Sequence, residues 1–227
     1  MSLTITGGFT ATGGWSVSLP PGSPTATAGW YGGGNGPVST IDRITFATDT
    51  ATATARGPLS SATYKLGATG NLTYGWFAGG VLAGAAPFYS LSTVQRITYA
   101  TDTATASVRG PLAAPTRSLA ASGNTTDGWF GGGYNGPAGG PNILSLVSRI
   151  TYATDTSTAS QRGPLTIARS KPGSVSDNSA YSWFAGGTPG PFSTIDRITY
   201  ATDTATSETR GPLTAGVMQT SATSGAQ

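Results

Sequence analysis

Cysteine and histidine are both absent from this 227-residue sequence. Without cysteine the chain can form neither a disulfide framework nor a thiolate zinc site. Without histidine it lacks the commonest general base and the commonest metal ligand. We therefore predict no metal site, no cofactor and no catalytic residue.

Charge is also scarce, since charged residues make up 9% of the chain and about a quarter of a typical globular protein. Twelve basic and nine acidic residues leave a net charge of +3. Most of the basic residues are arginines that recur at two fixed positions of a repeat: Arg43, Arg56, Arg96, Arg109, Arg149, Arg162, Arg197 and Arg210. The positive charge is thus spread along the chain, whereas a nucleic-acid interface needs clustered Lys and Arg. We predict no nucleic-acid partner.

Long hydrophobic runs are missing too. No apolar stretch approaches the roughly 20 residues that span a bilayer, so we predict no membrane insertion. No N-terminal stretch has the basic-then-apolar pattern of a signal peptide. We therefore expect a soluble product that is made in the cytoplasm.

Glycine is abundant, with 34 residues, and much of it belongs to a unit that occurs four times. The second half of the unit is clearest at 149–165, with an Arg-Ile-Thr-Tyr head, an Ala-Thr-Asp-Thr centre and an Arg-Gly-Pro-Leu end. A Trp-aromatic-Gly segment precedes each copy. The repeated positions are Trp30, Trp76, Trp129 and Trp183, the head arginines Arg43, Arg96, Arg149 and Arg197, and the aspartates Asp49, Asp102, Asp155 and Asp203.

Each unit contains four predicted strands, because Thr, Ile, Val and aromatic residues favour strands and Gly-Pro pairs end them. The first strand follows Gly-Pro-Leu, as at 63–69, and the second is the Trp segment. The third is Arg-Ile-Thr-Tyr, and the fourth is exemplified by 104–109. We predict a tight hairpin at Ala-Thr-Asp-Thr, with the Asp carboxylate accepting bonds from the backbone N–H groups just ahead.

Four short antiparallel strands in a unit of about 50 residues are typical of a β-propeller blade. We predict an all-β propeller with four four-stranded blades over 29–227. Residues 1–28 are predicted to be an N-terminal arm or a degenerate partial blade, and a hairpin at 4–20 would add a fifth, incomplete blade. The tail at 217–223 aligns with the first strand of a unit, while the first unit starts at its Trp strand. We therefore predict that N- and C-terminal strands share a blade, which closes the ring and removes exposed edges.

The order Trp-Phe-Gly-Gly, Arg-Ile-Thr-Tyr, turn and Gly-Pro-Leu resembles the kelch repeat. The Trp of the last kelch strand is missing, and Trp stands ahead of the glycines instead. The repeat more closely resembles kelch-like repeats in virion structural proteins, of the tail or fibre type, from tailed phages of marine cyanobacteria, over about 29–220. The resemblance implies a phage structural protein on the tail or particle surface, in multiple copies and bound to other virion proteins. Adhesion to a host-surface glycan is a further role that it leaves open.

The repeated charged and aromatic residues each allow two interpretations. The arginines and aspartates can form salt bridges between or within blades, or the arginines can form a ring at one end of the channel that binds an anion or a sulfated glycan. The Trp–aromatic pairs can pack adjacent blades together, or their exposed rings can stack on a sugar.

The connections between the glycines and the next head arginine differ in length, although they occupy the same place in each unit and should emerge on one face. They run over 35–42, 81–95, 134–148 and 188–196. Binding often resides on variable loops, and Tyr and Asn are good contact residues. The candidate binding residues on the two long loops are Phe88, Tyr89, Tyr134, Asn135 and Asn142. Neutral drift of surface loops is the alternative.

These observations favour a non-enzymatic virion protein that attaches to other proteins. The alternative is a free carbohydrate-binding lectin with multivalent sites. A lectin predicts the same residues at equivalent loop positions in every blade, and these loops differ. A glycosidase needs a carboxylate pair with separated pKa values, whereas most acids here belong to repeated positions.

Overall fold

The computed structural model describes residues 26–34, 38–82, 89–136 and 142–224. These residues form five antiparallel sheets of two to four strands, with short 3-10 helices and no α-helix in the described ranges. The predicted all-β fold is confirmed. Within the same ranges, no helix is long and apolar enough to cross a membrane.

Four of the sheets repeat along the chain, and we number them 1 to 4. Sheet 1 has three strands: β1 (Ala28–Gly32), β2 (Ile41–Thr45) and β3 (Thr54–Arg56). Sheet 2 has four: β5 (Gly67–Gly70), β6 (Tyr74–Ala78), β8 (Val94–Thr98) and β9 (Ser107–Arg109). Sheet 3 also has four: β10 (Ala120–Gly123), β11 (Asp127–Gly131), β12 (Val147–Thr151) and β13 (Ser160–Arg162). Sheet 4 completes the series: β14 (Gly173–Ser176), β15 (Tyr181–Ala185), β16 (Ile195–Thr199) and β17 (Glu208–Arg210).

The remaining elements are short. A two-stranded ribbon consists of β4 (Thr63–Tyr64) and β7 (Val81–Leu82). A 3-10 helix follows the strand that carries the head arginine in each repeat sheet: η1 (Phe46–Thr48), η2 (Tyr99–Thr101), η3 (Tyr152–Thr154) and η4 (Tyr200–Thr202). The predicted tight hairpin between the third and fourth strands is therefore a longer connection, in which the repeated Asp caps the 3-10 helix at its C-terminal end.

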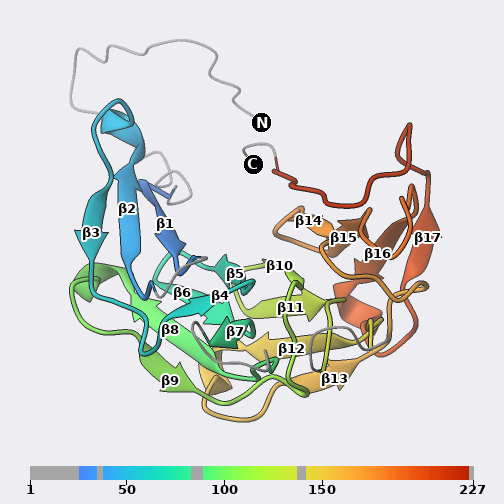
Figure 1. Cartoon of the computed structure of the whole chain (residues 1–227), viewed down its shortest axis with the longest axis horizontal. Helices are drawn as coiled ribbons and strands as arrows, with labels where there is room; N and C mark the ends of the chain where they lie inside the picture. Colours follow the sequence, from blue (N-terminus) through green and yellow to red (C-terminus); the bar gives the residue numbers. More distant parts are fainter. Residues whose placement is uncertain (1–25, 35–37, 83–88, 137–141, 225–227) are drawn as a thin grey trace, which may run out of the picture.

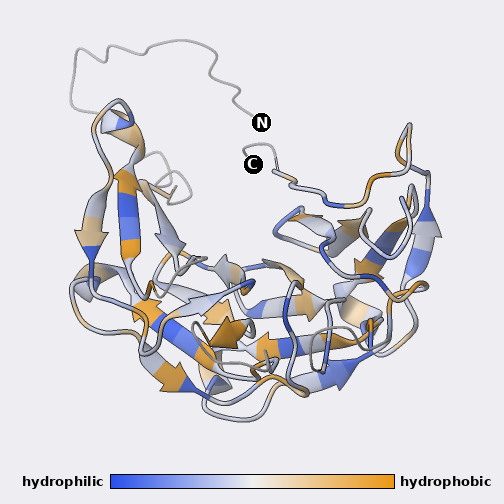
Figure 2. Cartoon of the chain, in the orientation of Figure 1, coloured by the Kyte–Doolittle hydropathy of each residue, from blue (hydrophilic) through white to orange (hydrophobic). Residues whose placement is uncertain are grey.

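The four sheets follow one another along an arc, with sheet 1 at one end and sheet 4 at the other (Figure 1). Within each sheet the strands pair in chain order, and the second strand sets Trp opposite the head Arg, as for Trp76 and Arg96. The third strands have apolar residues at their ends and hydrophilic residues in the middle (Figure 2). This pattern buries the ends, as in Val94 and Ile97, and leaves the central arginine for a polar contact.

The glycine pair after each Trp strand brings the backbones of successive units together. Gly79 has a φ of +72°, and a Cβ there would lie 2.3 Å from the carbonyl oxygen of Thr116 in the next unit. A side chain would therefore be strained and would also clash. The close backbone approach at these glycines allows Gly80 N–H to donate to Thr116 O at 2.8 Å.

The predicted ring closure is not formed. The tail does lie where the first strand of a following sheet would lie: Gly187 N–H donates to Val217 O at 2.9 Å, as Gly133 N–H donates to Arg169 O at 2.7 Å. However, the tail does not pair with β1, and sheet 1 keeps three strands. The two ends of the arc face an opening instead (Figure 1). The predicted arm at 1–28 falls outside the described residues up to 25, and β1 begins at Ala28, one residue before the predicted boundary.

Candidate functional site

Successive sheets are joined by one carboxylate that receives three donors from the sheet before it. Asp155, which follows η3, accepts a hydrogen bond from Trp76 Nε1 at 2.8 Å and one from Arg96 Nη1 at 3.0 Å. The Nε of Arg109 lies 3.6 Å from the same oxygen. The Asp155 side chain is 5% exposed. We call this set the junction: Trp and two Arg on its donor side, and the Asp of the next sheet on its acceptor side.

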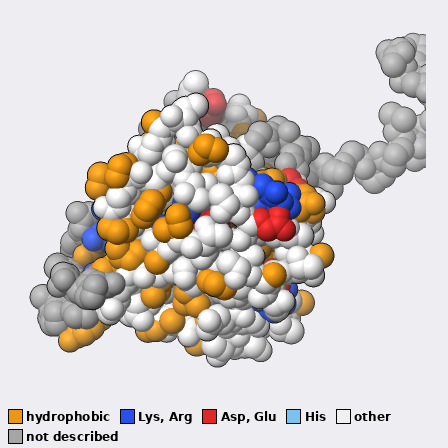
Figure 3. Space-filling view, turned by 90° about the vertical axis from the view of Figure 1, so that its right-hand side faces the viewer, with side chains coloured by type: hydrophobic (Ala, Val, Ile, Leu, Met, Phe, Trp, Pro, Cys, Tyr) orange, Lys and Arg blue, Asp and Glu red, His pale blue; other side chains and the backbone are white. Residues whose placement is uncertain are grey.

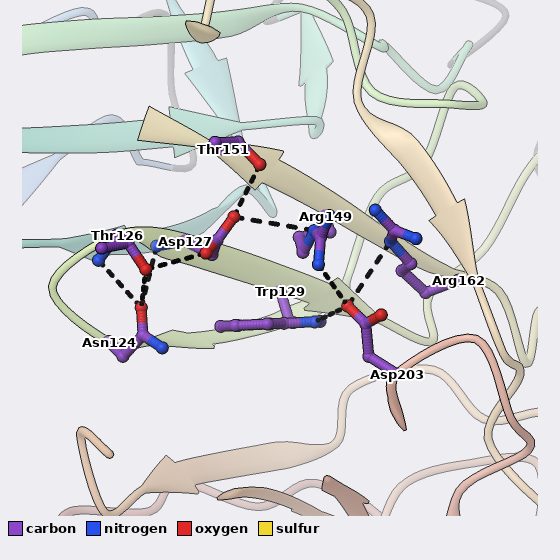
Figure 4. Close-up of polar contacts among 8 residues, drawn as sticks. All are labelled: Asn124, Thr126, Asp127, Trp129, Arg149, Thr151, Arg162 and Asp203. Atoms are coloured by element: carbon purple, nitrogen blue, oxygen red, sulfur yellow. Dashed lines mark hydrogen bonds and ion pairs between the residues drawn. The ribbon is translucent and has the colours of Figure 1, made fainter. Parts of the chain in front are cut away.

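The junction occurs twice more with nearly the same geometry. Between sheets 1 and 2, Asp102 accepts from Trp30 Nε1 at 2.9 Å and lies 3.3 Å from Arg43 and 3.4 Å from Arg56. Between sheets 3 and 4, Asp203 accepts from Trp129 Nε1 at 2.9 Å and lies 3.0 Å from Arg149 and 3.4 Å from Arg162 (Figure 4). The predicted salt bridges between repeats are confirmed, because each arginine pairs with the aspartate of the next unit.

An aromatic stack accompanies each junction. The Tyr that opens the 3-10 helix lies flat on the Trp of the preceding sheet, with centroid distances of 3.9 Å for Trp30–Tyr99, 3.8 Å for Trp76–Tyr152 and 3.8 Å for Trp129–Tyr200. Trp76 and Trp129 are 0% and 1% exposed. The packing interpretation of these two tryptophans is confirmed, and sugar stacking on their rings is wrong because the rings are buried.

The local role predicted for the repeated aspartates is wrong in all three junctions. Each carboxylate bonds to the side chains of the preceding sheet rather than to the N–H groups just ahead of it. The 3-10 turn is closed by the backbone instead, since Ala104 N–H donates to Thr101 O at 3.1 Å. Sequence alone could not reveal this, because the partner lies more than 70 residues away.

The tight turns before the Trp strands of sheets 3 and 4 have the side-chain-to-backbone bonds that the sequence predicted for the repeated aspartates. Asn124 Oδ1 accepts from the N–H groups of Thr126 and Asp127 (Figure 4). Asp177 Oδ1 accepts from three N–H groups of residues 179–181 at 2.8–2.9 Å. Partial burial favours the neutral form of Asp177, but these backbone bonds outweigh it and lower its pKa below the usual value.

Asp127 extends the junction of sheet 3. It accepts from Thr151 Oγ1 at 2.6 Å and from Thr126 Oγ1 at 2.8 Å, and it lies 3.6 Å from Arg149 Nε (Figure 4). Arg149 is therefore held between Asp127 of its own sheet and Asp203 of the next one. This additional carboxylate orients the guanidinium toward the junction.

In the part of the chain that the structure describes, the arc has two ends at which the junction residues meet no neighbouring sheet. At the sheet 4 end, Arg197 and Arg210 bond to Glu208 of their own sheet, whose side chain is 55% exposed. At the sheet 1 end, Asp49 is exposed and Phe46, which takes the place of the stacking Tyr, is 50% exposed. The predicted repeat residues Trp183, Arg197 and Asp49 thus differ from their counterparts in the interior of the arc.

A buried ion pair in sheet 4 was not predicted. Arg169 Nη2 donates to Asp196 Oδ2 at 2.9 Å, and both side chains are 0% exposed. Arg169 Nη1 also donates to the carbonyl oxygens of Gly186 and Thr194, and Asp196 accepts from the Thr166 hydroxyl. Burial lowers the pKa of Arg169, and the Asp196 charge opposes this effect. The sequence signal was that Arg169 does not belong to the repeat, since Thr63 and Thr116 stand at the equivalent positions of two other units.

The structure brings some of the predicted loop residues together. Tyr134 stacks under the guanidinium of Arg117 at 4.3 Å, and its carbonyl accepts from Ser90 Oγ of the other long loop at 2.8 Å. Asn135 N–H donates to Asn142 O at 2.9 Å within its own loop. Tyr89 is 60% exposed. Phe88 lies outside the described residues, and the glycan-binding and neutral-drift interpretations of these loops both stay predictions.

In the described part of the chain, no three Asp or Glu residues come close enough to hold a metal ion. The charged groups there act mainly on one another. The eight repeated arginines and Arg169 all lie in ion pairs with carboxylates. The chemistry that this arrangement supports is the joining of one sheet to the next.

The stacked tyrosines give a pH-dependent prediction. Burial raises the pKa of Tyr99 and Tyr200 from 10.0 to about 12, and it also raises the pKa of Tyr152. Between pH 10 and 12 the unfolded chain loses these protons while the folded chain keeps them, so the free energy of unfolding should fall as pH rises. Urea unfolding across this window checks the slope. The variant Tyr99→Phe/Tyr200→Phe should show a shallower decline, and an unchanged slope would contradict the assignment.

No model of a known protein family matches the sequence, and no curated protein matches it. Among solved structures, that of YjhT superposes with a TM-score of 0.63 at 8% sequence identity. The match covers 78% of this chain and 60% of that chain, so this chain spans less than two thirds of YjhT. At this identity the likeness extends to the fold alone.

Proposed function

We propose that this chain is a non-enzymatic structural protein of a phage particle, in which a propeller-like array of sheets mediates attachment to other proteins. The four repeat sheets correspond to the blades predicted from the sequence, arranged as an open propeller. The proposed place is the tail or the particle surface, and host adhesion is the further role of the long loops.

The structural role is supported by the position of the repeated charged side chains, most of which lie between sheets. In a chain with few charged residues, the three junctions engage the two repeated arginines of sheets 1 to 3 and the aspartates of sheets 2 to 4. Charged side chains at a catalytic centre are held ready for a substrate, whereas these hold sheets together. The phage context comes from the resemblance of the repeat to kelch-like virion proteins.

The proposal is tested on purified phage particles from the source of the sequence. Mass spectrometry should detect the chain in intact particles, and gold-labelled antibody should place it on the tail or the surface in the electron microscope. Position on a fibre tip would favour adhesion, and position along the shaft or head would favour attachment within the particle. Well-purified particles without the chain would overturn the proposal.

The lectin alternative is tested on the purified recombinant chain. A screen against immobilised glycans, repeated with Tyr89→Ala, separates the two functions. Glycan binding that Tyr89→Ala abolishes, by a chain that is absent from particles, would favour the lectin. The four loops share a serine, at Ser39, Ser92, Ser145 and Ser193, but they have no aromatic residue at equivalent positions in all four units. This favours the structural protein over a lectin with one aromatic sugar-stacking site per sheet.

A further inference from the structure

We propose that the two ends of the arc bind each other between copies of this chain: sheet 4 of one copy and sheet 1 of a second copy form the same junction that joins successive sheets within the chain. This inference goes beyond the proposed function and does not depend on a phage origin. It rests on three features that the two ends present in complementary form.

The first feature is a preformed donor side on sheet 4. Arg197 stands opposite Trp183 and stacks over Tyr181 at 4.3 Å, as Arg96 stands opposite Trp76 and stacks over Tyr74 at 4.2 Å. Within the described residues no acceptor bonds to Trp183 Nε1, and no ring lies flat on Trp183. The donors are thus in place while the acceptor and the stacking ring are missing.

The second feature is an exposed acceptor side on sheet 1. Asp49 and Phe46 occupy the positions that Asp155 and Tyr152 have in the interior. The Asp155 side chain is 5% exposed and Tyr152 is 7% exposed, whereas Asp49 is exposed and Phe46 is 50% exposed. Sheet 1 therefore presents the carboxylate and the ring that sheet 4 lacks.

The third feature is a missing strand and a strand that could replace it. Among the described residues, which begin at 26, sheet 1 has no first strand, and a groove of about 400 Å³ lies between β1 and β5, lined by Trp30, Thr69 and Phe77. On sheet 4, the tail at 217–224 holds the position of the first strand of a next sheet, with Thr220 and Ala222 against Gly173. In the proposed contact this tail enters the groove and pairs with the free edge of β1, as in strand addition between chains.

The acceptor for sheet 4 has to come from a second copy. The nine acidic residues all lie in the described ranges, so the segments outside them contribute no acidic side chain. Asp102, Asp155 and Asp203 are already engaged in junctions. Asp49 is the remaining acid at the junction position, and sheet 1, to which its turn belongs, stands across the opening of the arc from sheet 4 in the same chain (Figure 1).

Glu208 competes with this contact. It faces Arg197 across β16 and β17, where sheets 2 and 3 have Ser107 and Ser160 opposite their arginines. Its carboxylate is bonded to Arg197 at 2.9 Å and to Arg210. The pair is exposed, and such pairs contribute little and are displaced readily. Figure 3 views the molecule from the sheet 4 side, and a group of adjoining basic and acidic side chains stands out there among hydrophobic and uncharged ones.

Because the two surfaces differ, the contact is heterologous: repeated, it closes into a ring or continues as a filament. Sedimentation velocity over a wide concentration range tests it on the full chain. We expect concentration-dependent association, tightened up to about fivefold in Glu208→Ser because the competing carboxylate is gone. Asp49→Ala and Trp183→Ala should each weaken it, and Tyr89→Ala, which removes another exposed aromatic side chain, should leave it unchanged.

Mixing two variants of the chain shows which two surfaces form the contact. A copy with Asp49→Ala keeps its donor side and a copy with Trp183→Ala keeps its acceptor side, so the mixture should form one intact contact and stop at a dimer. An interface that pairs like ends, sheet 1 with sheet 1 or sheet 4 with sheet 4, would gain nothing from mixing. If wild type and Glu208→Ser both stay monomeric, or if they associate equally well with Asp49→Ala in place, the proposal is overturned.

Discussion

Replacing Asp196 by alanine is expected to lower the free energy of unfolding by about 3–5 kcal/mol, because it leaves Arg169 buried and without its counter-charge. Both side chains are 0% exposed, so water cannot take the place of the carboxylate. Thr166 would lose its acceptor as well. Urea unfolding followed by tryptophan fluorescence measures the loss.

The chain contains a matched control for this variant. Asp42 occupies the equivalent strand position in sheet 1 and is only half-buried, so Asp42→Ala should change the free energy of unfolding by about 0.5 kcal/mol or less. The double variant Arg169→Met/Asp196→Ala removes both charges and should be more stable than Asp196→Ala alone. If Arg169→Met brings no recovery in the Asp196→Ala background, the buried charge is not the cause of the loss.

Replacing Asp155 by alanine is expected to cost about 3 kcal/mol, since three donors lose one shared acceptor. The indole N–H of Trp76 is fully buried, and the guanidinium groups of Arg96 and Arg109 are about one-fifth exposed. Asp155→Asn should recover part of the loss, because its amide oxygen can still accept from Trp76. The same unfolding experiment gives both values.

The matched control is the exposed aspartate at the start of the series. Asp49→Ala removes the same side chain from the same 3-10 turn, but Asp49 has no sheet before it. At a concentration where the chain is monomeric, its effect should be close to zero. Equal losses for Asp49→Ala and Asp155→Ala would mean that the aspartate acts through its own turn, as we had first predicted, and not through the junction.

The sequence predicted the second and third strands of each unit well, because their signals are local. The first strand expected at 63–69 is wrong, since it is divided into β4 and β5, which belong to different sheets, and the fourth expected at 104–109 is shortened to β9. Each Trp-aromatic-Gly segment and each Arg-Ile-Thr segment became a strand, and their pairing follows chain order. The alignment of the tail with a first strand was also correct: Thr220 lies against Gly173 as Leu119 lies against Gly67. A repeat conveys such positions because each copy must meet its neighbour in the same way.

The sequence did not predict features that depend on spatial partners. The Asp of the repeat suited a turn, and only its distance to an indole 79 residues earlier revealed its other role. The closure prediction was wrong since sequence alignment places a strand in a unit but does not say whether the ends of the array meet. Arg169 and Asp196 escaped notice because each replaces an uncharged residue in at least one other copy.

The junction has a direction, since its donors always belong to one repeat and its carboxylate to the next. A duplicated repeat inserted in frame would therefore bring both halves of a new junction with it. A deleted repeat would join its two neighbours through the same four junction positions, one Trp, two Arg and one Asp. Gene duplication or loss can thus lengthen or shorten this array by whole sheets without a compensating change at any existing contact, so repeat number is free to vary among descendants of such a chain.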